Sequence, residues 1–296
     1  MKYLFTFLVL TFSFSAYSQI KVKSERDDKG IITLTYTNNS KMTYTVLLEF
    51  PVLLNLSTSS GPRVIAVAYP GKGKLTTLRP VLSTRRTNYS YKYTYVKGNI
   101  YGKTKGEPIY LVPVKEGAMV RASSMTHIEN VLQPKEEKDE YAGLAFLFDE
   151  EVEIVAPRKG IIAAMSMENE GSSEKLDFNR SENFIEIYHE DGKITKIMVL
   201  KSGSQKVKLG QEVFPGDVLA TSAGENYQHG KHVRMLVYVV VKDEEGSIKN
   251  EAIPVKFAVE GQSFFLENYG PFEVTFPEEV ITQEMTKKEL KSYRKE

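Results

Sequence analysis

Residues 207–219 read VKLGQEVFPGDVL, and they set the character of the second half of the chain. Two glycines, Gly210 and Gly216, lie within this stretch. Each can adopt the positive φ that a tight turn needs, because glycine has no Cβ atom. Val207 and Val213 are expected to point inward beside these turns. The stretch therefore predicts two tight turns joined by short strands, as in a β domain.

Three further stretches extend the same pattern in both directions. Residues 155–162, VAPRKGII, predict a strand, a turn and a strand, and residues 230–234, GKHVR, lead into an apolar strand. Residues 183–192, NFIEIYHEDG, alternate and end in an Asp-Gly hairpin turn. Almost no helical periodicity separates the strands expected at Leu144–Phe148, Val152–Ala156, Gly160–Met167, Asn183–Tyr188, Ile194–Leu200, Val218–Ala220 and His232–Val241. We expect one β domain over residues 141–245.

The first half of the chain also favours strands. Short β-branched and aromatic runs separated by turn residues predict an immunoglobulin-like β-sandwich over residues 19–100, so the expected fold class is all-β. The expected strands are Ile31–Thr37, Thr43–Phe50, Val64–Ala68, Lys74–Leu78 and Asn88–Val96. In the last of these, tyrosines at 89, 91, 93 and 95 share one strand face. They form either an aromatic binding strip or, as we favour, a cover over the core or a domain interface.

The remaining segments are assigned by composition. Residues 101–140, which end in a charged run from 134 to 140, are expected to be a linker. Residues 246–277 form a C-terminal extension with one candidate strand at Pro271–Phe276. Residues 278–296 are a charged tail, in which Thr286 and Glu289 are spaced as a helix capping box.

The N-terminus has the features of a secretory signal peptide. Lys2 precedes the apolar stretch from residue 4 to residue 14, which is too short to span a bilayer, and small residues at 16 and 18 predict cleavage before Gln19. The alternative is a short membrane anchor. We therefore expect an exported protein, periplasmic or secreted, with residues 1–18 removed and no membrane span left.

Overall composition excludes several classes of function. The formal net charge of +1 gives no global field for binding nucleic acid. The chain has no cysteine, so it has neither disulfides nor a thiolate zinc site, and it is not a lipoprotein. Any metal would need His, Asp or Glu. The histidines are His127, His189, His229 and His232.

Taken in order, the motifs between residues 140 and 241 resemble those of the lysostaphin-type, LytM-like zinc endopeptidases of metallopeptidase family twenty-three, which cut peptide crosslinks in bacterial cell walls. The resemblance implies a duplicated hybrid motif of the barrel-sandwich type. It also implies a zinc ion held by an early His, an Asp and the second His of a late "HxH" motif. The first His of that motif and one further His serve catalysis, and the open zinc position takes a water molecule.

Carried over residue by residue, this site is largely lost. The Asp position falls on Ala145, which has no donor atom, and the second position of "HxH" falls on Arg234, a permanent cation. The other catalytic His falls on Val199. The early His falls on Tyr141, or on His127 if a long insertion is allowed. His232 is a remnant, no catalytic residue is assigned, and no metal is expected.

Two alternatives remain open for the altered site. His229 and His232, together with His189 or Asp191, would gather a metal if the loops converged differently. Separately, Arg234 beside His232 would attract an anion such as a carboxylate, unless Arg234 pairs with a nearby acid such as Glu186 or Asp191 and serves only the fold. The ligand-binding candidates are His232, Arg234, Tyr141 and His189.

These observations predict a non-catalytic envelope protein without a cofactor. Its expected partner is a peptidoglycan stem peptide or another envelope protein, such as a cell-wall hydrolase that it regulates. One alternative is an active zinc endopeptidase with unusual ligands, and zinc is expected only in that case. A second alternative is a purely structural adaptor.

Overall fold

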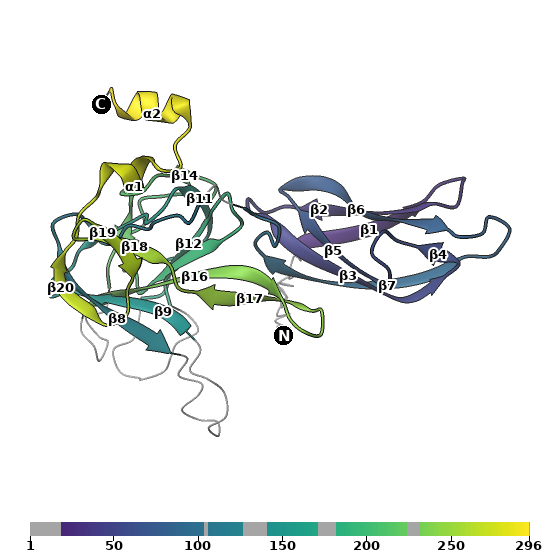
Figure 1. The fold of residues 1–296 in the computed structure, drawn as a ribbon, viewed down its shortest axis with the longest axis horizontal. Helices are drawn as coiled ribbons and strands as arrows, with labels where there is room; N and C mark the ends of the chain where they lie inside the picture. Colours follow the sequence, from purple (N-terminus) through teal and green to yellow (C-terminus); the bar gives the residue numbers. More distant parts are fainter. Residues whose placement is uncertain (1–18, 104–105, 127–140, 171–181, 224–230, 296) are drawn as a thin grey trace, which may run out of the picture.

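The computed structural model describes residues 19–103, 106–126, 141–170, 182–223 and 231–295. They form two β lobes that lie end to end along the long axis of the molecule (Figure 1). All strand pairs within the sheets are antiparallel, and the described helices are two short ones near the C-terminus. The expectation of an all-β chain is confirmed.

The first lobe consists of two sheets that share one apolar core. One sheet has the order β1-β2-β6-β4 and the other has the order β5-β3-β7. The bounds are β1 Ile20–Arg26, β2 Ile32–Asn38, β3 Tyr44–Leu54, β4 Leu56–Ser57, β5 Arg63–Ala68, β6 Gly71–Pro80 and β7 Asn88–Lys97. Strict alternation in β2 buries Ile32, Leu34 and Tyr36 in this core. The sheets face each other because each buries one apolar side.

The four tyrosines of β7 cover the core of this lobe. They alternate with exposed residues along the strand, and their half-buried rings pack against the buried cluster. The ring of Tyr95 meets that of Tyr44 edge-on, with 5.6 Å between centroids. The interpretation of these tyrosines as a cover rather than an exposed binding strip is confirmed.

The second lobe is built on a nine-stranded sheet of order β14-β11-β12-β13-β16-β9-β8-β20, with β17 also paired to β16. Two small sheets, β10-β15 and β18-β19, complete the lobe. The bounds are β8 Met119–Thr126, β9 Tyr141–Leu147, β10 Glu153–Val155, β11 Gly160–Ser166, β12 Phe184–Tyr188, β13 Ile194–Met198, β14 Glu212–Val213, β15 Val218–Thr221, β16 His232–Lys242, β17 Ile248–Ile253, β18 Lys256–Val259, β19 Gln262–Phe265 and β20 Tyr269–Glu273.

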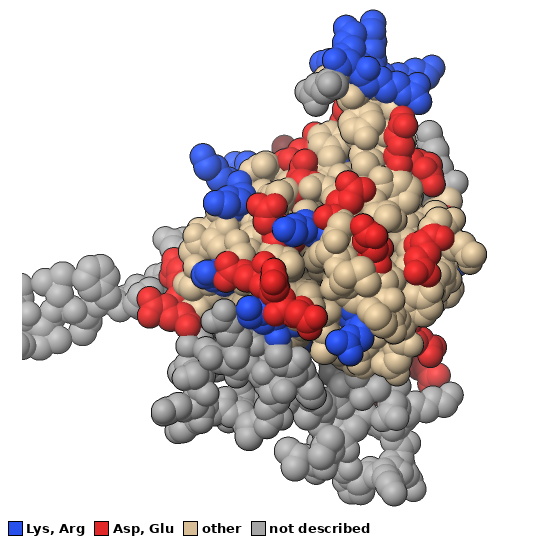
Figure 2. Space-filling model, turned by 90° about the vertical axis from the view of Figure 1, so that its left-hand side faces the viewer, with Lys and Arg blue, Asp and Glu red and all other residues tan. Residues whose placement is uncertain are grey.

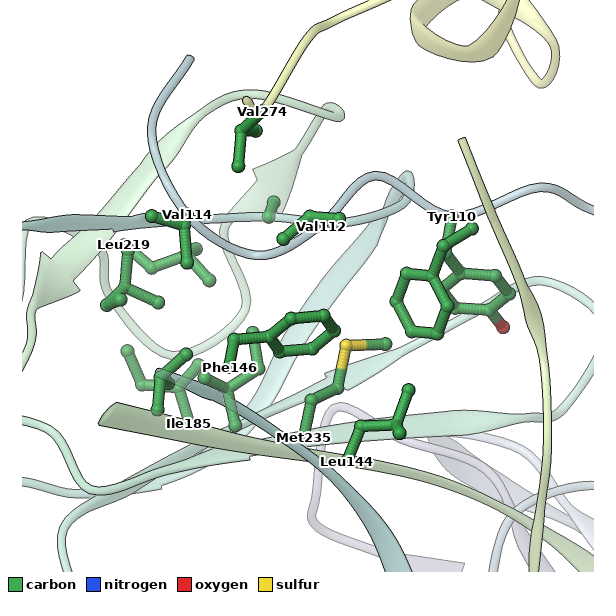
Figure 3. Close-up of a cluster of buried hydrophobic side chains, with 14 of the residues drawn as sticks. Tyr110, Val112, Val114, Leu144, Phe146, Ile185, Leu219, Met235 and Val274 are labelled. Carbon is green, nitrogen blue, oxygen red and sulfur yellow. The ribbon is translucent and has the colours of Figure 1, made fainter. Parts of the chain in front are cut away.

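One face of the large sheet carries the core of the second lobe (Figure 3). Val233, Met235 and Val237 of β16 alternate into it, as do Leu144 and Phe146 of β9. Their neighbours along each strand point to the opposite face. The two turns expected in residues 207–219 are present, with Gly210 at φ 82° and Gly216 at φ 93°.

The linker expected over residues 101–140 is wrong for its central part. Tyr110, Val112 and Val114 are buried in the core of the second lobe, and Tyr110 exchanges backbone hydrogen bonds with β18 (Figure 3). Strand β8 then pairs with β9 inside the large sheet. The extension expected over residues 246–277 belongs to the same lobe, because β17 and β20 pair with β16 and β8. The second lobe therefore begins well before residue 141.

The two lobes share an apolar contact. Ile194 and Tyr238 of the second lobe belong to the buried cluster of the first. At its edge, Lys97 of β7 lies 2.6 Å from the carboxylate of Glu186 in β12, which is almost fully buried. Because apolar contacts and an ion pair to the buried Glu186 carboxylate both cross the junction, the lobes are held together by more than the connecting chain.

Helices α1 (Glu278–Thr282) and α2 (Lys287–Tyr293) end the chain. The capping box is confirmed: Thr286 Oγ1 accepts from the Glu289 N–H, and the Glu289 carboxylate accepts from the Thr286 N–H at 2.6 Å. None of the helices among the described residues combines the length and apolar character that crossing a bilayer requires.

Candidate functional site

The positions that carry the resemblance meet on three neighbouring strands. Arg234 of β16 lies directly opposite Ala145 of β9 on one side and opposite Met198 of β13 on the other. His232, two residues before Arg234, is opposite Leu147. Because side chains alternate along a strand, His232 and Arg234 point to the same face of the sheet. This face is the one turned away from the core of the second lobe. Ala145, Arg234 and His232 thus form one small surface, which we call the Arg234 surface.

The guanidinium of Arg234 forms an ion pair with the carboxylate of Glu182, just before β12. Both side chains are largely buried, with 16% and 14% of their surface exposed. The alternative in which Arg234 pairs with an acid is the one the structure shows, but the partner is Glu182 rather than Glu186 or Asp191. Glu186 pairs with Lys97, and Asp191 pairs with Arg158, both farther along the strands.

His232 begins β16 and is 4% exposed. Its backbone forms an isolated bridge to Ala223. Val199, at the position of the second catalytic histidine, follows β13 with φ 69° and is buried. A valine offers neither a proton acceptor nor a metal ligand, so this position can supply neither function.

Three candidates from the sequence lie wholly or partly outside the described residues. Tyr141 begins β9, opposite Thr126, but its side chain lies outside the described residues. His127 and His229 also lie outside them. The surface defined above therefore consists of Ala145, His232 and Arg234, with Glu182 as the partner of Arg234.

His189 lies away from the Arg234 surface. Tyr188 pairs with Ile194, which pairs with Tyr238, four residues from Arg234 along β16. At about 3.3 Å per residue this places the hairpin roughly 13 Å from Arg234. The predictions that His189 binds a ligand beside His232, or helps to gather a metal with it, do not agree with this placement.

The imidazole of His189 is fully buried and is engaged at both nitrogens. Nδ1 lies 2.7 Å from the carbonyl oxygen of Lys159, and Nε2 lies 2.7 Å from Thr195 Oγ1. Burial, together with the nearby charge of Arg158, lowers the pKa of His189 to about 3. The ring is therefore neutral at physiological pH, and it serves the fold of the hairpin.

A buried ionic network that the sequence did not reveal lies beside His189. Arg158, which has no exposed surface, donates to the Asp191 carboxylate at 3.0 and 3.2 Å and to Tyr110 Oη at 3.0 Å. Its other nitrogens donate to the Glu284 carboxylate at 2.6 and 2.7 Å. Burial is the largest influence on Asp191 and raises its pKa, but the Arg158 guanidinium and the Lys193 ammonium together outweigh burial and hold the pKa of that carboxyl below its usual value.

This network fastens the C-terminal segment to the second lobe. Glu284 lies between α1 and α2, and next to it in space Lys159 Nζ lies 2.8 Å from the Glu289 carboxylate of α2. The Lys159 ammonium and the capping hydrogen bond from Thr286 together lower the pKa of Glu289 to about 2. Arg158 and Lys159 lie in the turn that the sequence predicts between the two strands of residues 155–162.

The residues present do not fit a catalytic zinc ion at the Arg234 surface. Of the residues carried over, Ala145 and Val199 have no donor atom, and Arg234 brings a fixed positive charge. In the described part of the chain, no three His, Asp or Glu residues are grouped so as to hold a metal ion.

Comparisons with known proteins give structural similarities alone. No family model matches the chain, and no curated protein matches it. In a SpoIIQ–SpoIIIAH pore-forming complex, one chain is 16% identical with a TM-score of 0.32, over 49% of this chain and 89% of that one. Csd3 from Helicobacter pylori is 10% identical with a TM-score of 0.32, over 93% and 82% of the two chains. A zinc-containing peptidase from Vibrio cholerae is 11% identical with a TM-score of 0.28, over 73% and 81%.

The chain is thus similar in structure to peptidases of the kind that its sequence motifs resemble, and to SpoIIQ. At TM-scores near 0.3, these similarities carry no argument about what this chain does.

Proposed function

We propose that this chain is an exported, non-catalytic envelope protein, in which an immunoglobulin-like sandwich is followed by a LytM-like domain that binds rather than cuts. The observation that carries the proposal is the ion pair of Arg234, which lies directly opposite Ala145, with Glu182. The N-terminal sequence, with its apolar stretch ending before Gln19, supports export to the periplasm or beyond.

The charge of Arg234 opposes a metal ion at the position where the resemblance would place zinc. A zinc ion needs lone pairs from neutral imidazoles or carboxylates, whereas a guanidinium offers only N–H donors and stays protonated. The ion pair of Arg234 with Glu182 also uses the nearest described carboxylate. A divalent cation placed there would meet a like charge in a partly buried setting, where repulsion is screened less than in water.

The same arrangement suits an anion. An Arg guanidinium binds carboxylates through parallel N–H donors, and the stem peptides of cell-wall peptidoglycan carry carboxylates. Glu182 holds the guanidinium in place, and a ligand carboxylate would have to exchange with it. We therefore propose a cell-wall stem peptide as the ligand, with Arg234 as the group that recognises its carboxylate. The alternative partner is an envelope hydrolase whose activity the domain regulates.

Binding to purified sacculi and to a synthetic stem peptide tests this proposal. Arg234→Ala should weaken peptide binding roughly tenfold or more, since a hydrogen bond to a charged group contributes about 1.5–3 kcal/mol. Glu182→Gln should strengthen it, because the competing carboxylate is gone. A purely structural ion pair would not produce these opposite effects. Lys201→Ala, which breaks an exposed pair with Glu151, is the matched control and should leave binding unchanged.

Metal analysis and a digestion assay separate this proposal from the alternative of an active enzyme. We expect the purified chain to lack stoichiometric zinc and to release no fragments from sacculi. Stoichiometric zinc together with chelator-sensitive cleavage would establish the atypical peptidase instead. A chain that captures an envelope protein while showing no ligand at the Arg234 surface would instead act as a structural adaptor.

A further inference from the structure

The end of the first lobe that lies farthest from the second lobe carries a group of exposed aliphatic side chains. Val52 and Leu54 at the end of β3 are 39% and 59% exposed, and Val81 and Leu82 just after β6 are 62% and 46% exposed. Figure 1 places the ends of these strands beside β4, at the tip remote from the second lobe. We call these four residues the apical cluster.

The loop that presents the apical cluster is held rigidly by Asn55. This residue adopts φ 52°, and its side-chain amide donates to the carbonyl oxygens of Leu82 and Arg85 at 2.8 and 2.9 Å. Its Oδ1 accepts from the Leu82 N–H at 2.9 Å, and its backbone oxygen accepts from the Val81 N–H at 3.1 Å. Four hydrogen bonds thus fix a loop whose apolar side chains point to water. The exposure belongs to the folded conformation.

Cationic side chains surround the apical cluster. Arg79, Arg85 and Arg86 are exposed in or beside the same loop, and Arg26 donates to Thr87 Oγ1 at 2.6 Å. Lys29 lies in the adjoining turn, where Asp27 and Asp28 supply the acidic residues. Glu25, exposed beside Arg26, adds a third carboxylate, so the group holds five cations against three carboxylates. Within the part of the chain that the structure describes, no ion pair joins any of these five cations to an acid.

We propose that this tip docks on an anionic phospholipid surface. Aliphatic side chains on a protruding loop can enter the boundary between headgroups and acyl chains, while the flanking guanidiniums bind phosphates. Both features occur on one tip, and the net charge of that tip has the sign that an anionic leaflet attracts. The guanidiniums suit phosphate better than ammonium groups would, because they bind in a bidentate manner. This surface is separate from the Arg234 surface and does not depend on any ligand there.

The opposite end of the molecule differs in character. Figure 2 shows acidic and basic side chains interspersed over the second lobe, with cations gathered at the top. That group corresponds to α2 and its end, which carry Lys287, Lys288, Lys291, Arg294 and Lys295. This cation group could also bind an anionic surface through charge alone, so the experiment must distinguish it from the apical cluster.

Vesicle sedimentation provides the first measurement, using the chain from residue 19 onward so that the apolar stretch before it cannot contribute. We expect binding to vesicles of phosphatidylglycerol mixed with phosphatidylcholine, and much weaker binding to phosphatidylcholine alone. Val81→Ser combined with Leu82→Ser should weaken binding at least about tenfold, because two aliphatic side chains no longer leave water. Arg85→Gln combined with Arg86→Gln should weaken it and reduce its sensitivity to salt.

The absence of tryptophan from the chain allows a second, site-specific measurement. Leu82→Trp introduces a single indole at the tip, and its fluorescence should shift to shorter wavelength when anionic vesicles are added. Leu209→Trp is the matched control, because Leu209 is 57% exposed but lies in the second lobe. Its fluorescence should stay unchanged. Both positions are at the surface, so neither substitution disturbs a core.

Three results would overturn the proposal. The first is that the unaltered chain fails to bind anionic vesicles. The second is that Lys287→Gln combined with Lys288→Gln abolishes binding while the tip variants bind normally. The third is a blue shift at position 209 without one at position 82. None of these results bears on the stem-peptide proposal, which is tested without lipid.

Discussion

Replacing Arg158 by methionine should lower the free energy of unfolding by about 3 kcal/mol, because it removes the cation from a buried ionic network. Arg158 has no exposed surface, and it joins Asp191, Tyr110 and Glu284 through hydrogen bonds of 2.6–3.2 Å. Methionine restores much of the apolar volume of the arginine stem. The loss therefore reports on charge rather than on a cavity.

The magnitude follows from what each partner retains. Removing one member of a buried pair costs about 3–5 kcal/mol when the other is left without compensation. Asp191 is 2% exposed, but it keeps the ammonium of Lys193 at 2.8 Å. Glu284 is 21% exposed and can gain water. Both effects reduce the penalty, so we expect the lower end of that range.

Urea denaturation followed by circular dichroism at neutral pH measures this change, provided that the slope of the transition is the same for both proteins. Lys249→Ala is the control, because Lys249 and Glu251 form a pair that is half exposed on both sides, at 3.8 Å. It should change stability by less than about 1 kcal/mol. Arg158→Met should also hasten proteolysis within residues 278–295, which Glu284 no longer anchors. A loss of less than about 1 kcal/mol for Arg158→Met would refute the reasoning.

Three further substitutions test other parts of the structure. The fold lowers the pKa of His189 to about 3, so as pH falls below about 6.5 the unfolded chain binds a proton that the folded chain does not, and the folded state loses stability. His189→Gln should therefore reduce the fall of the melting temperature between pH 6.5 and 4.5, and an unchanged pH dependence would contradict this. Gly102→Ala would place a Cβ atom 1.9 Å from the backbone oxygen of Asp191, and we expect at least about 1–3 kcal/mol of destabilisation in the same urea assay, whereas Gly106→Ala, with open space around it, should have little effect. Lys97→Met leaves its almost fully buried carboxylate partner without a cation and should destabilise the junction between the lobes, by about 2 kcal/mol or more in calorimetry; equal melting temperatures would show that the pair contributes nothing.

Features set by neighbouring residues could be predicted from the sequence. The glycine turns in residues 207–219, the Asp-Gly hairpin and the capping box at Thr286 all depend on contacts a few residues apart. The alternation of tyrosines in β7 likewise needs only the period of a strand. Each is present because local geometry and burial favour the same conformation.

Features set by distant residues could not be predicted in this way. Arg158 lies in a turn, where a charged residue is ordinarily solvated, and its partners are 33 and 126 residues away in the chain. Residues 110–114 include Pro113 and show no strand period, so their burial follows from packing against β18 and the large sheet. The candidate site divides similarly: strand register brings Ala145 opposite Arg234, but the choice of Glu182 as partner depends on where a separate segment lies.

The apolar contact between the lobes limits how the protein can be divided. A fragment ending near residue 103 would leave Tyr44 and Tyr95 without Ile194 and Tyr238, which complete the same buried cluster. Such a truncated sandwich would expose an apolar patch at its end and tend to self-associate. The contribution of each surface is therefore best tested by substitutions within the whole chain rather than by deleting one lobe, because neither lobe has a complete core without the other.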